Sequence, residues 1–180
     1  MPSNKQKRAV IITAEGYEDE EVIYPAIRLK EAGFEVYIAT KDAKPVLGRL
    51  NFPLELIVKY YATLVDSLKL NPADYDMVLI PGGFEAPDRV RQQKPVLEFI
   101  KKMNRQKKVV SAFCHGPWVL ISAGILKGKN ATCYPGIVDD LKNAGAHYVD
   151  EPAVIDDNII TARHPRDVMN LMKAILSKFK

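Results

Sequence analysis

Residues 109–117 read VVSAFCHGP, and WVLISAG follows them up to Gly124. The first five residues are mostly apolar, which predicts a buried strand. Pro117 suits the first turn of a helix, and the residues after it are apolar at helical spacing. Cys114 and His115 therefore stand at a predicted bend between a buried strand and a helix.

The same alternation of short apolar runs and helical spacing extends along the whole chain. Such an order predicts parallel βαβ crossovers and a layered α/β sandwich in one domain of 180 residues, with residues 1–7 as a flexible tail. The expected strands are Arg8–Thr13, Phe34–Thr40, Met77–Ile80 and Val109–Phe113, and Ala153–Ile155 and Ile159–Ala162 form an expected hairpin. The expected helices cover Val22–Leu29, Pro95–Gln106, the segment after Pro117, Ile137–Ala144 and Val168–Phe179, while Gly48–Leu70 reads as strand pieces plus a short helix.

Composition excludes several classes of protein. Hydrophobic residues make up 47% of the chain, enough for a large core, and the net charge of +4 is scattered. No basic stripe with interleaved aromatics indicates nucleic-acid binding, and no apolar run is long enough to span a membrane. The polar start MPSNKQKR lacks the apolar stretch of a signal peptide, and two cysteines make no disulfide framework. We therefore expect a reduced, cytoplasmic protein.

Three predicted strand ends carry unusual residues. Thr13–Asp19 follows the first strand, Pro81–Asp88 follows the third, and Cys114 with His115 follows the fourth. In a parallel sheet these segments meet at one edge, where ligands bind in such folds. The sequence thus predicts a functional site at the carboxyl edge of the sheet.

The bend at Cys114 favours a reactive thiol. A helix start offers free N–H groups that stabilise a thiolate, and His115 can act as a base. Cysteine is also among the most buried residue types, and a Cys-His pair alone would favour a structural role. The strand-to-helix context favours a reactive thiol at Cys114. Cys133 lies in a strand-like piece without an adjacent base, and we expect it to be buried and to take no part in the chemistry.

Two other loops supply candidate partners for the thiol. Glu18 lies at the junction of the first loop and helix, and a protonated carboxyl there would donate a hydrogen bond to the sulfur. The alternative is that the acids of Glu15–Glu21 only stabilise the first turn of the helix. In IPGGFEAPDRVR, Gly83 would offer an N–H to an oxyanion, although the segment is equally typical of a turn and helix start.

Together the segments TAEGYEDEEVIYPAIRLKEAGFEVYIAT, IPGGFEAPDRVR, AFCHGPW and YPGIVDDLKNAG resemble the ThiJ/PfpI family of intracellular proteases and deglycase-like enzymes. The resemblance covers most of the chain in the family's order. It implies a flavodoxin-like three-layer α/β/α sandwich with a mostly parallel sheet, related to the class I glutamine amidotransferase fold.

The resemblance also implies roles for single residues. Cys114 matches the elbow nucleophile, His115 the general base, and Glu18 the acid that contacts the sulfur. The N–H groups of Gly83 and His115 match the oxyanion hole. Asp88 matches an acid that reaches the histidine of a neighbouring subunit, which implies a homo-oligomer, a dimer or a hexamer.

Two features depart from the family's pattern. The stretch from Lys44 to Leu70 looks longer than the usual hairpin and is expected to alter pocket access or assembly. In TARHPRDV, Arg163 and Pro165 are family-like, but His164 stands where a smaller residue is expected. With Gly82, Gly116 and Arg163, His164 is a candidate pocket residue, although a partly exposed loop position fits it as well.

The resulting hypothesis is a cysteine-dependent hydrolase that acts on a small carbonyl or peptide substrate. Peptidase, protein deglycase and glutathione-independent glyoxalase chemistry share the attack of the thiolate on a carbonyl. This chemistry requires no metal or nucleotide, and the chain carries no Walker A or dinucleotide fingerprint. Nucleic acid and membrane are not expected as partners either, on the composition described above. The rivals are a redox-sensing stress-response or chaperone-like protein that uses the same cysteine, and a binding domain with a vestigial elbow.

Overall fold

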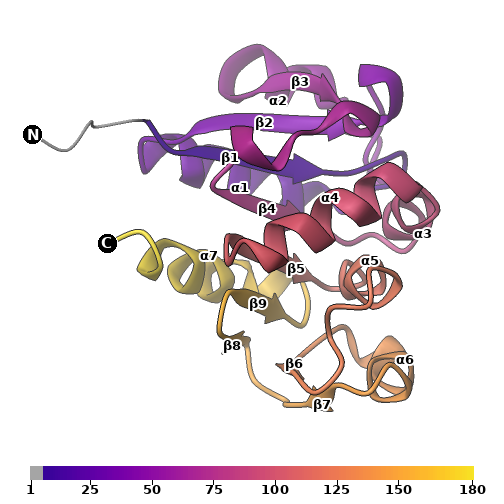
Figure 1. The fold of residues 1–180 in the computed structure, drawn as a ribbon. Coiled ribbons are helices and arrows are strands. Elements are labelled where there is room, and N and C mark those ends of the chain that lie inside the picture. The colour runs from indigo at the N-terminus through magenta and orange to yellow at the C-terminus, as the bar shows by residue number, and fades with distance from the viewer. Residues whose placement is uncertain (1–5) are drawn as a thin grey trace, which may run out of the picture.

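A computed structural model describes residues 6–180 and shows a seven-stranded sheet in the order β3-β2-β1-β4-β5-β9-β8 (Figure 1). Neighbouring strands are parallel except for β8 and β9, which form the predicted antiparallel hairpin. The strands are β1 (Arg8–Ile12), β2 (Glu35–Thr40), β3 (Thr63–Asp66), β4 (Met77–Ile80), β5 (Val109–Phe113), β8 (Ala153–Asp156) and β9 (Ile159–Ala162), and β6 (Asn130–Ala131) and β7 (His147–Tyr148) form a separate pair.

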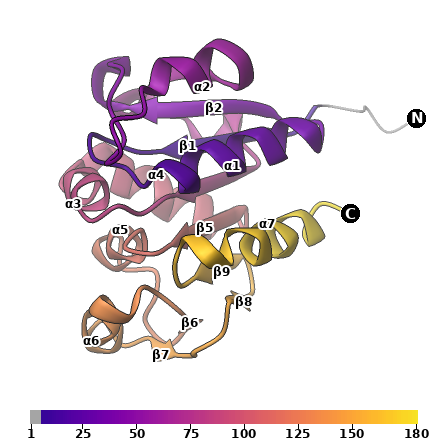
Figure 2. The same ribbon diagram turned by 180° about the vertical axis from the view of Figure 1, so that it is seen from behind.

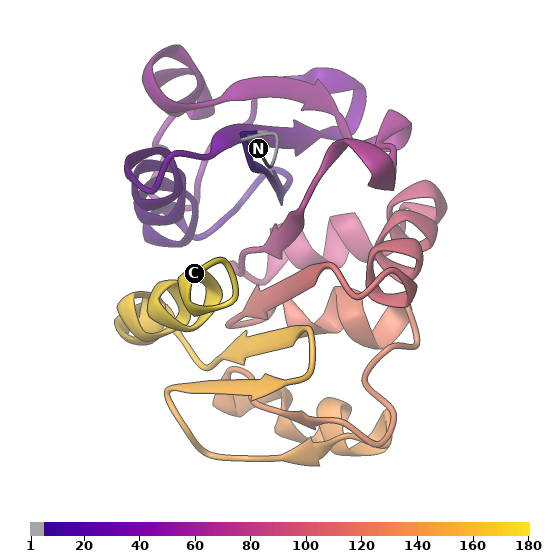
Figure 3. The same cartoon turned by 60° about the vertical axis from the view of Figure 1, so that its left-hand side comes forward.

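Helices cover both faces of the sheet. Figure 2 shows α1 and α7 on one face, and Figure 1 shows α4 and α5 on the other. Figure 3 shows the C-terminal helix beside the indigo α1, opposite the pink and orange helices. The helices are α1 (Asp19–Glu31), α2 (Leu54–Tyr61), α3 (Glu85–Arg91), α4 (Lys94–Arg105), α5 (Pro117–Ser122), α6 (Val138–Asn143) and α7 (Val168–Ser177). The expected three-layer, flavodoxin-like sandwich is confirmed.

The central strands are buried because helices cover both of their faces. Strands β4, β5 and β9 are buried throughout, and β1 is buried after its first residue. Strands of this kind read as continuous apolar runs, which is why the sequence located them well. Their carboxyl ends all lie at one edge, so the loops after β1, β4 and β5 meet there as predicted.

The segment between β2 and β4 supplies a helix and an edge strand, as the sequence indicated. Before α2, Gly48 forms a parallel bridge with Tyr17 and Leu47 an antiparallel bridge with Pro53. A Cβ on Gly48 would lie 2.1 Å from Oδ1 of Asp19, so any other residue there would displace the Asp19 carboxylate. We call residues 44–70 the extra segment, because from the sequence this stretch is expected to be longer than the family's hairpin. The bridges at Leu47 and Gly48 fasten the extra segment to the loop that follows β1, at the edge that carries Cys114.

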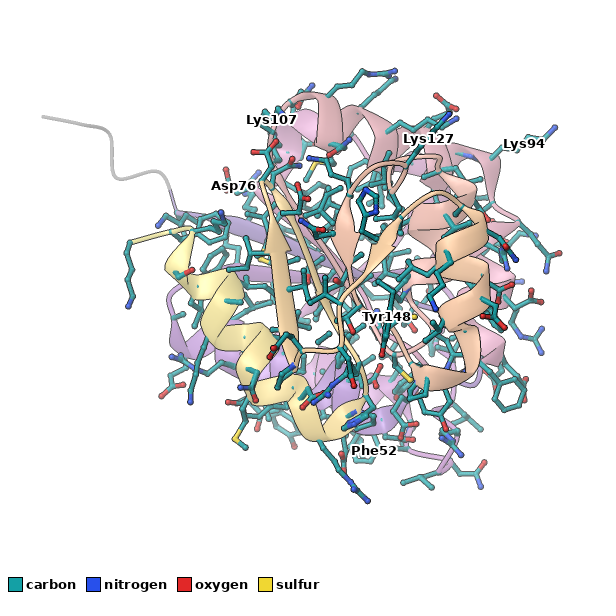
Figure 4. All side chains as sticks on the ribbon, turned by 90° about the horizontal axis from the view of Figure 1, so that it is seen from below. Phe52, Asp76, Lys94, Lys107, Lys127 and Tyr148 are labelled. Atoms are coloured by element: carbon teal, nitrogen blue, oxygen red, sulfur yellow. The ribbon has the colours of Figure 1, made fainter. Side chains whose placement is uncertain are left out.

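Figure 4 shows the two ends of the molecule. Asp76 and Lys107, which precede β4 and β5, lie at one end, and Phe52 of the extra segment lies at the other. Phe52 also fastens this segment, because its carbonyl accepts a hydrogen bond from the Tyr17 hydroxyl at 2.8 Å.

Residues 1–5 of the predicted tail lie outside the described residues. Lys7, also assigned to that tail, lies against the body of the protein: its Nζ donates to the Phe179 carbonyl at 2.5 Å, and its own carbonyl accepts from the Glu35 N–H at 2.9 Å. Within residues 6–180, every helix is too short or too polar to cross a bilayer.

Candidate active site

Cys114 occupies a strained bend directly after β5. Its φ is +59°, a left-handed conformation that costs a non-glycine residue about 1–2 kcal/mol. The bend is fixed on both sides, because the Cys114 N–H donates to Ala162 at 3.1 Å and its carbonyl accepts from Tyr134 at 2.9 Å. A Cβ on Gly116 would lie 2.3 Å from the Ile80 carbonyl oxygen, so the chain can turn into α5 only with glycine there. The predicted elbow is present.

The elbow brings the thiol together with its expected partners. The Cys114 Sγ lies 3.3 Å from Nδ1 of His115. The backbone N–H groups of Gly83 and His115 both hydrogen-bond the sulfur and lower the pKa of the thiol. The two amides assigned to an oxyanion hole therefore point at the atom that would carry or transfer negative charge.

Burial acts on the pKa of the thiol in the opposite direction to those amides. Cys114 is only 4% exposed, and this loss of water, together with the nearby Glu21 carboxyl, raises the pKa of the thiol above its usual value. The expectation of an accessible thiolate at neutral pH is therefore wrong for this chain. With this raised pKa the sulfur keeps its proton at neutral pH.

The acid beside the sulfur is Glu21 rather than the predicted Glu18. The Glu21 side chain is fully buried next to the thiol and accepts the Gly82 N–H through Oε2 at 2.5 Å. Burial raises the pKa of Glu21 from 4.5 to about 8, so the carboxyl is largely protonated at neutral pH. The physical reason for the correction is position: Glu18 precedes α1, whereas Glu21 lies one turn before Pro25 on the helix face that packs against the sheet.

Glu18 has a different partner. Its Oε2 accepts a hydrogen bond from the Arg49 guanidinium at 2.7 Å, and Arg49 comes from the extra segment before α2. The Arg49 N–H is fixed to the Tyr17 carbonyl at 2.9 Å. The extra segment thus delivers a cation to the rim of the site, close enough to affect both Cys114 and His115.

His115 is suited to accept a proton. Partial burial, with a smaller contribution from Arg49, lowers the pKa of the imidazole below its usual 6.5, so the ring is neutral at pH 7. Tyr134 stacks on the ring with centroids 4.6 Å apart, and Trp118 meets it edge-on at 5.1 Å. A neutral imidazole next to a thiol is the arrangement that general-base activation of a nucleophile requires.

The profile of the DJ-1/PfpI family matches residues 7–178. The chain belongs to the DJ-1/PfpI family. It is 38% identical over 173 residues to the protein named Deglycase PH1704 of Pyrococcus horikoshii, which covers 96% of this chain and 99% of that one. It is also 38% identical to General stress protein 18 of Bacillus subtilis over 90% of this chain and 91% of that one. Among solved structures, a two-domain protein of Anabaena variabilis with DJ-1/ThiJ/PfpI-like and ferritin-like domains superposes with a TM-score of 0.86 at 36% identity, over 97% of this chain and 48% of that one.

The other residues expected from the DJ-1/PfpI resemblance lie in different surroundings. Gly82 is needed for space, because a Cβ there would lie 2.5 Å from Cβ of Cys114. Asp88 is exposed on α3, where its side chain contacts Gln92 of the same helix. Arg163 pairs with Asp150 and Asp167 at 2.9 Å each.

His164 follows β9 and is partly exposed. Its Nδ1 lies 3.7 Å from Oδ2 of Asp167 and is buried without a hydrogen-bond partner in the described part of the chain. Cys133 is fully buried just beyond β6, which ends at Ala131, and burial raises the pKa of its thiol to about 12. The expected burial of Cys133 is therefore confirmed, although the residue lies outside a strand. In the same described part, no three His, Cys, Asp or Glu side chains gather as a metal site requires.

The sequence interpretation missed four residues of this DJ-1/PfpI site. Glu21 had a usable signal, since it shares the buried stripe of α1 with Val22 and Pro25. Arg49 and Tyr134 had none, because contacts between separate segments of the chain bring them to His115. Trp118 lies three residues after His115, one turn along the chain, and that spacing was a usable signal for a contact.

Proposed function

We propose that this protein is a cysteine-dependent hydrolase of the PfpI type that acts on carbonyl compounds as a deglycase. The observation that carries the proposal is the 3.3 Å contact between Cys114 Sγ and a neutral His115, at an elbow where two amides face the sulfur. The name of the Pyrococcus horikoshii relative supports the choice of a deglycase. Peptidase and glyoxalase activities are proposed as further uses of the same first step.

The chemistry begins with a concerted attack. As Sγ bonds to the carbonyl carbon, the S–H proton passes to Nδ1 of His115, and the carbonyl oxygen becomes an oxyanion between the Gly83 and His115 amides. Each such donor is worth about 3 kcal/mol of transition-state stabilisation. The imidazolium then returns its proton to the leaving group. With a glyoxal substrate the first adduct is a hemithioacetal, and the Glu21 carboxyl beside the sulfur is placed to relay protons.

The thiol's surroundings favour this reading over a peroxide sensor. Oxidation to sulfenic acid is fastest at exposed, low-pKa thiols, whereas Cys114 is nearly sealed and its pKa is raised. A stress function remains the rival because a similar relative carries the name General stress protein 18.

The test is turnover of methylglyoxal, a glycated thiol and a peptide by wild type, Cys114→Ala, His115→Gln and Glu21→Gln. Glu20→Gln is the matched control, since Glu20 is the exposed neighbour of Glu21. We expect Cys114→Ala to abolish turnover, His115→Gln to lower it at least a hundredfold, and the control to match wild type. Absence of turnover by wild type, together with stoichiometric oxidation of Cys114 by peroxide, would establish the sensor instead.

We propose further that the active form is a homo-oligomer in the cytoplasm, in which Asp88 of one copy orients His115 of another. Asp88 is exposed on α3, and an acid from a neighbour would complete the Cys-His pair. Mixing Asp88→Asn with Cys114→Ala tests this directly. In mixed oligomers one copy supplies Cys114 and the other Asp88, so activity should recover; no recovery in oligomers shown to exchange subunits would refute the shared site.

A further inference from the structure

The imidazole of His115 is enclosed by two aromatic rings from different elements. Tyr134, which precedes α6, stacks on one face with an interplanar angle of 25°, and Trp118 of α5 meets the ring at 64°. Among residues 6–180, the His115 side chain makes its hydrogen-bonding contact through Nδ1, with the Cys114 sulfur. The two rings therefore restrict how the imidazole can turn away from Cys114.

Trp118 is itself fixed. Its Nε1–H donates to Oδ2 of Asp140 on α6 at 2.8 Å, and the Arg91 guanidinium lies 5.5 Å from the centre of the indole. Arg91 is held in turn, because its Nε donates to the Ser122 hydroxyl at 2.9 Å. Turning the indole would break the hydrogen bond to Asp140 and lose the cation–π contact with Arg91.

A catalytic base works only when a further group holds it toward the nucleophile. We propose that Trp118, anchored by Asp140, is a positioning residue that holds the His115 imidazole with Nδ1 facing the Cys114 sulfur. Tyr134 closes the opposite side of the ring. The inference deepens the proposed hydrolase and rests on it: within one copy the indole holds the ring of the general base, beside the contact proposed from Asp88 of a neighbouring copy.

The charged groups around the imidazole are consistent with this role. The Cys114 thiol contacts the ring and Arg49, bonded to Glu18, lowers the pKa of the imidazole, while Arg91 and Asp140 contact the indole. The Asp140 carboxylate is bonded to the indole N–H, and the causes that lower the pKa of the imidazole are burial and Arg49. Loss of the indole contact should therefore change both the orientation of His115 and its pH response.

The test uses the full chain and four variants. Trp118→Phe keeps a ring but loses the N–H, and Asp140→Ala removes the acceptor. Asp140→Asn keeps an oxygen acceptor, and Asp139→Ala changes the exposed neighbour as a matched control. We expect kcat to fall about tenfold or more in Trp118→Phe and Asp140→Ala with KM within about twofold of wild type, and Asp140→Asn to retain most of the activity.

Fluorescence supplies a readout that needs no substrate, because Trp118 is the single tryptophan of the chain. A protonated imidazole in contact with an indole quenches its emission, so wild-type emission should fall as the pH drops through the His115 pKa, below 6.5. His115→Gln should abolish that transition. Asp140→Ala should shrink its amplitude by at least half, whereas Asp140→Asn and Asp139→Ala should keep it.

Two results would overturn the inference. One is an unchanged kcat in both Trp118→Phe and Asp140→Ala; the other is a fluorescence transition in Asp140→Ala equal to that of Asp139→Ala. If wild type turns over no substrate, the proposed hydrolase fails by itself. The positioning role is then decided by the fluorescence transition and by the rate of Cys114 alkylation with iodoacetamide, which must fall in Asp140→Ala for the inference to stand.

Discussion

Glu21 is a buried acid whose carboxyl keeps its proton in the folded protein, and its replacement by glutamine has a calculable effect on stability. Burial raises the pKa of Glu21 from 4.5 to about 8. In the unfolded chain the same carboxyl ionises near pH 4.5. Its contribution to stability is therefore fully present below about pH 4.5 and is lost as the pH rises toward 8.

The size of the effect follows from the shift. Each unit of pKa difference corresponds to about 1.4 kcal/mol, and between pH 5 and pH 8 the unfolded chain has already released the proton that the folded chain retains. The free energy of unfolding should thus fall by about 3 kcal/mol from this group alone. A glutamine at this position does not titrate. The free energy of unfolding of Glu21→Gln, relative to that of the parent, should therefore be about 3 kcal/mol higher at pH 8 than at pH 5.

Urea unfolding at pH 5 and pH 8 measures the difference. Both proteins should carry Cys114→Ala, which removes the effect of the thiol on the pKa of the carboxyl. Comparing the two pH values cancels the fixed cost of placing an amide beside the Gly82 N–H. Glu20→Gln, on the exposed side of α1, is the control and should follow the parent. Unfolding free energies of Glu21→Gln and the parent that change in parallel from pH 5 to pH 8 would refute the assigned proton.

Three further predictions concern the elbow. Cys114→Gly should be about 1 kcal/mol more stable than Cys114→Ala in urea unfolding, the reverse of the usual order, because φ is +59°; equal stabilities would contradict the strain. Gly82→Ala should lose about 2 kcal/mol or more, since its Cβ would lie 2.5 Å from Cβ of Cys114 and 2.7 Å from Oε2 of Glu21; a thermal midpoint equal to wild type would argue against that crowding. Cys133, fully buried with a raised pKa, should resist iodoacetamide in the native protein and react after unfolding, as mass spectrometry of labelled peptides would show.

The sequence by itself determined the architecture and the bend at which Cys114 lies. Strands buried on both faces must be continuous apolar runs, so β1, β4 and β5 were visible in the chain, and Gly33 and Gly145 marked helix ends. The bend at Cys114 was also a local property, because the turn needs Gly116 and the helix start favours Pro117.

Only the tertiary structure decided which groups surround the sulfur and in which protonation state. Glu18 and Glu21 are both acids at the entry to α1, and the rotation of that helix against the sheet selects Glu21. Arg49 and Tyr134 reach His115 from two separate segments whose meeting no local pattern encodes, whereas Trp118 lies only three residues after His115. The pKa of Cys114 was misjudged for the same reason: local amides lower it, but desolvation depends on everything packed around the thiol, and desolvation is the larger effect.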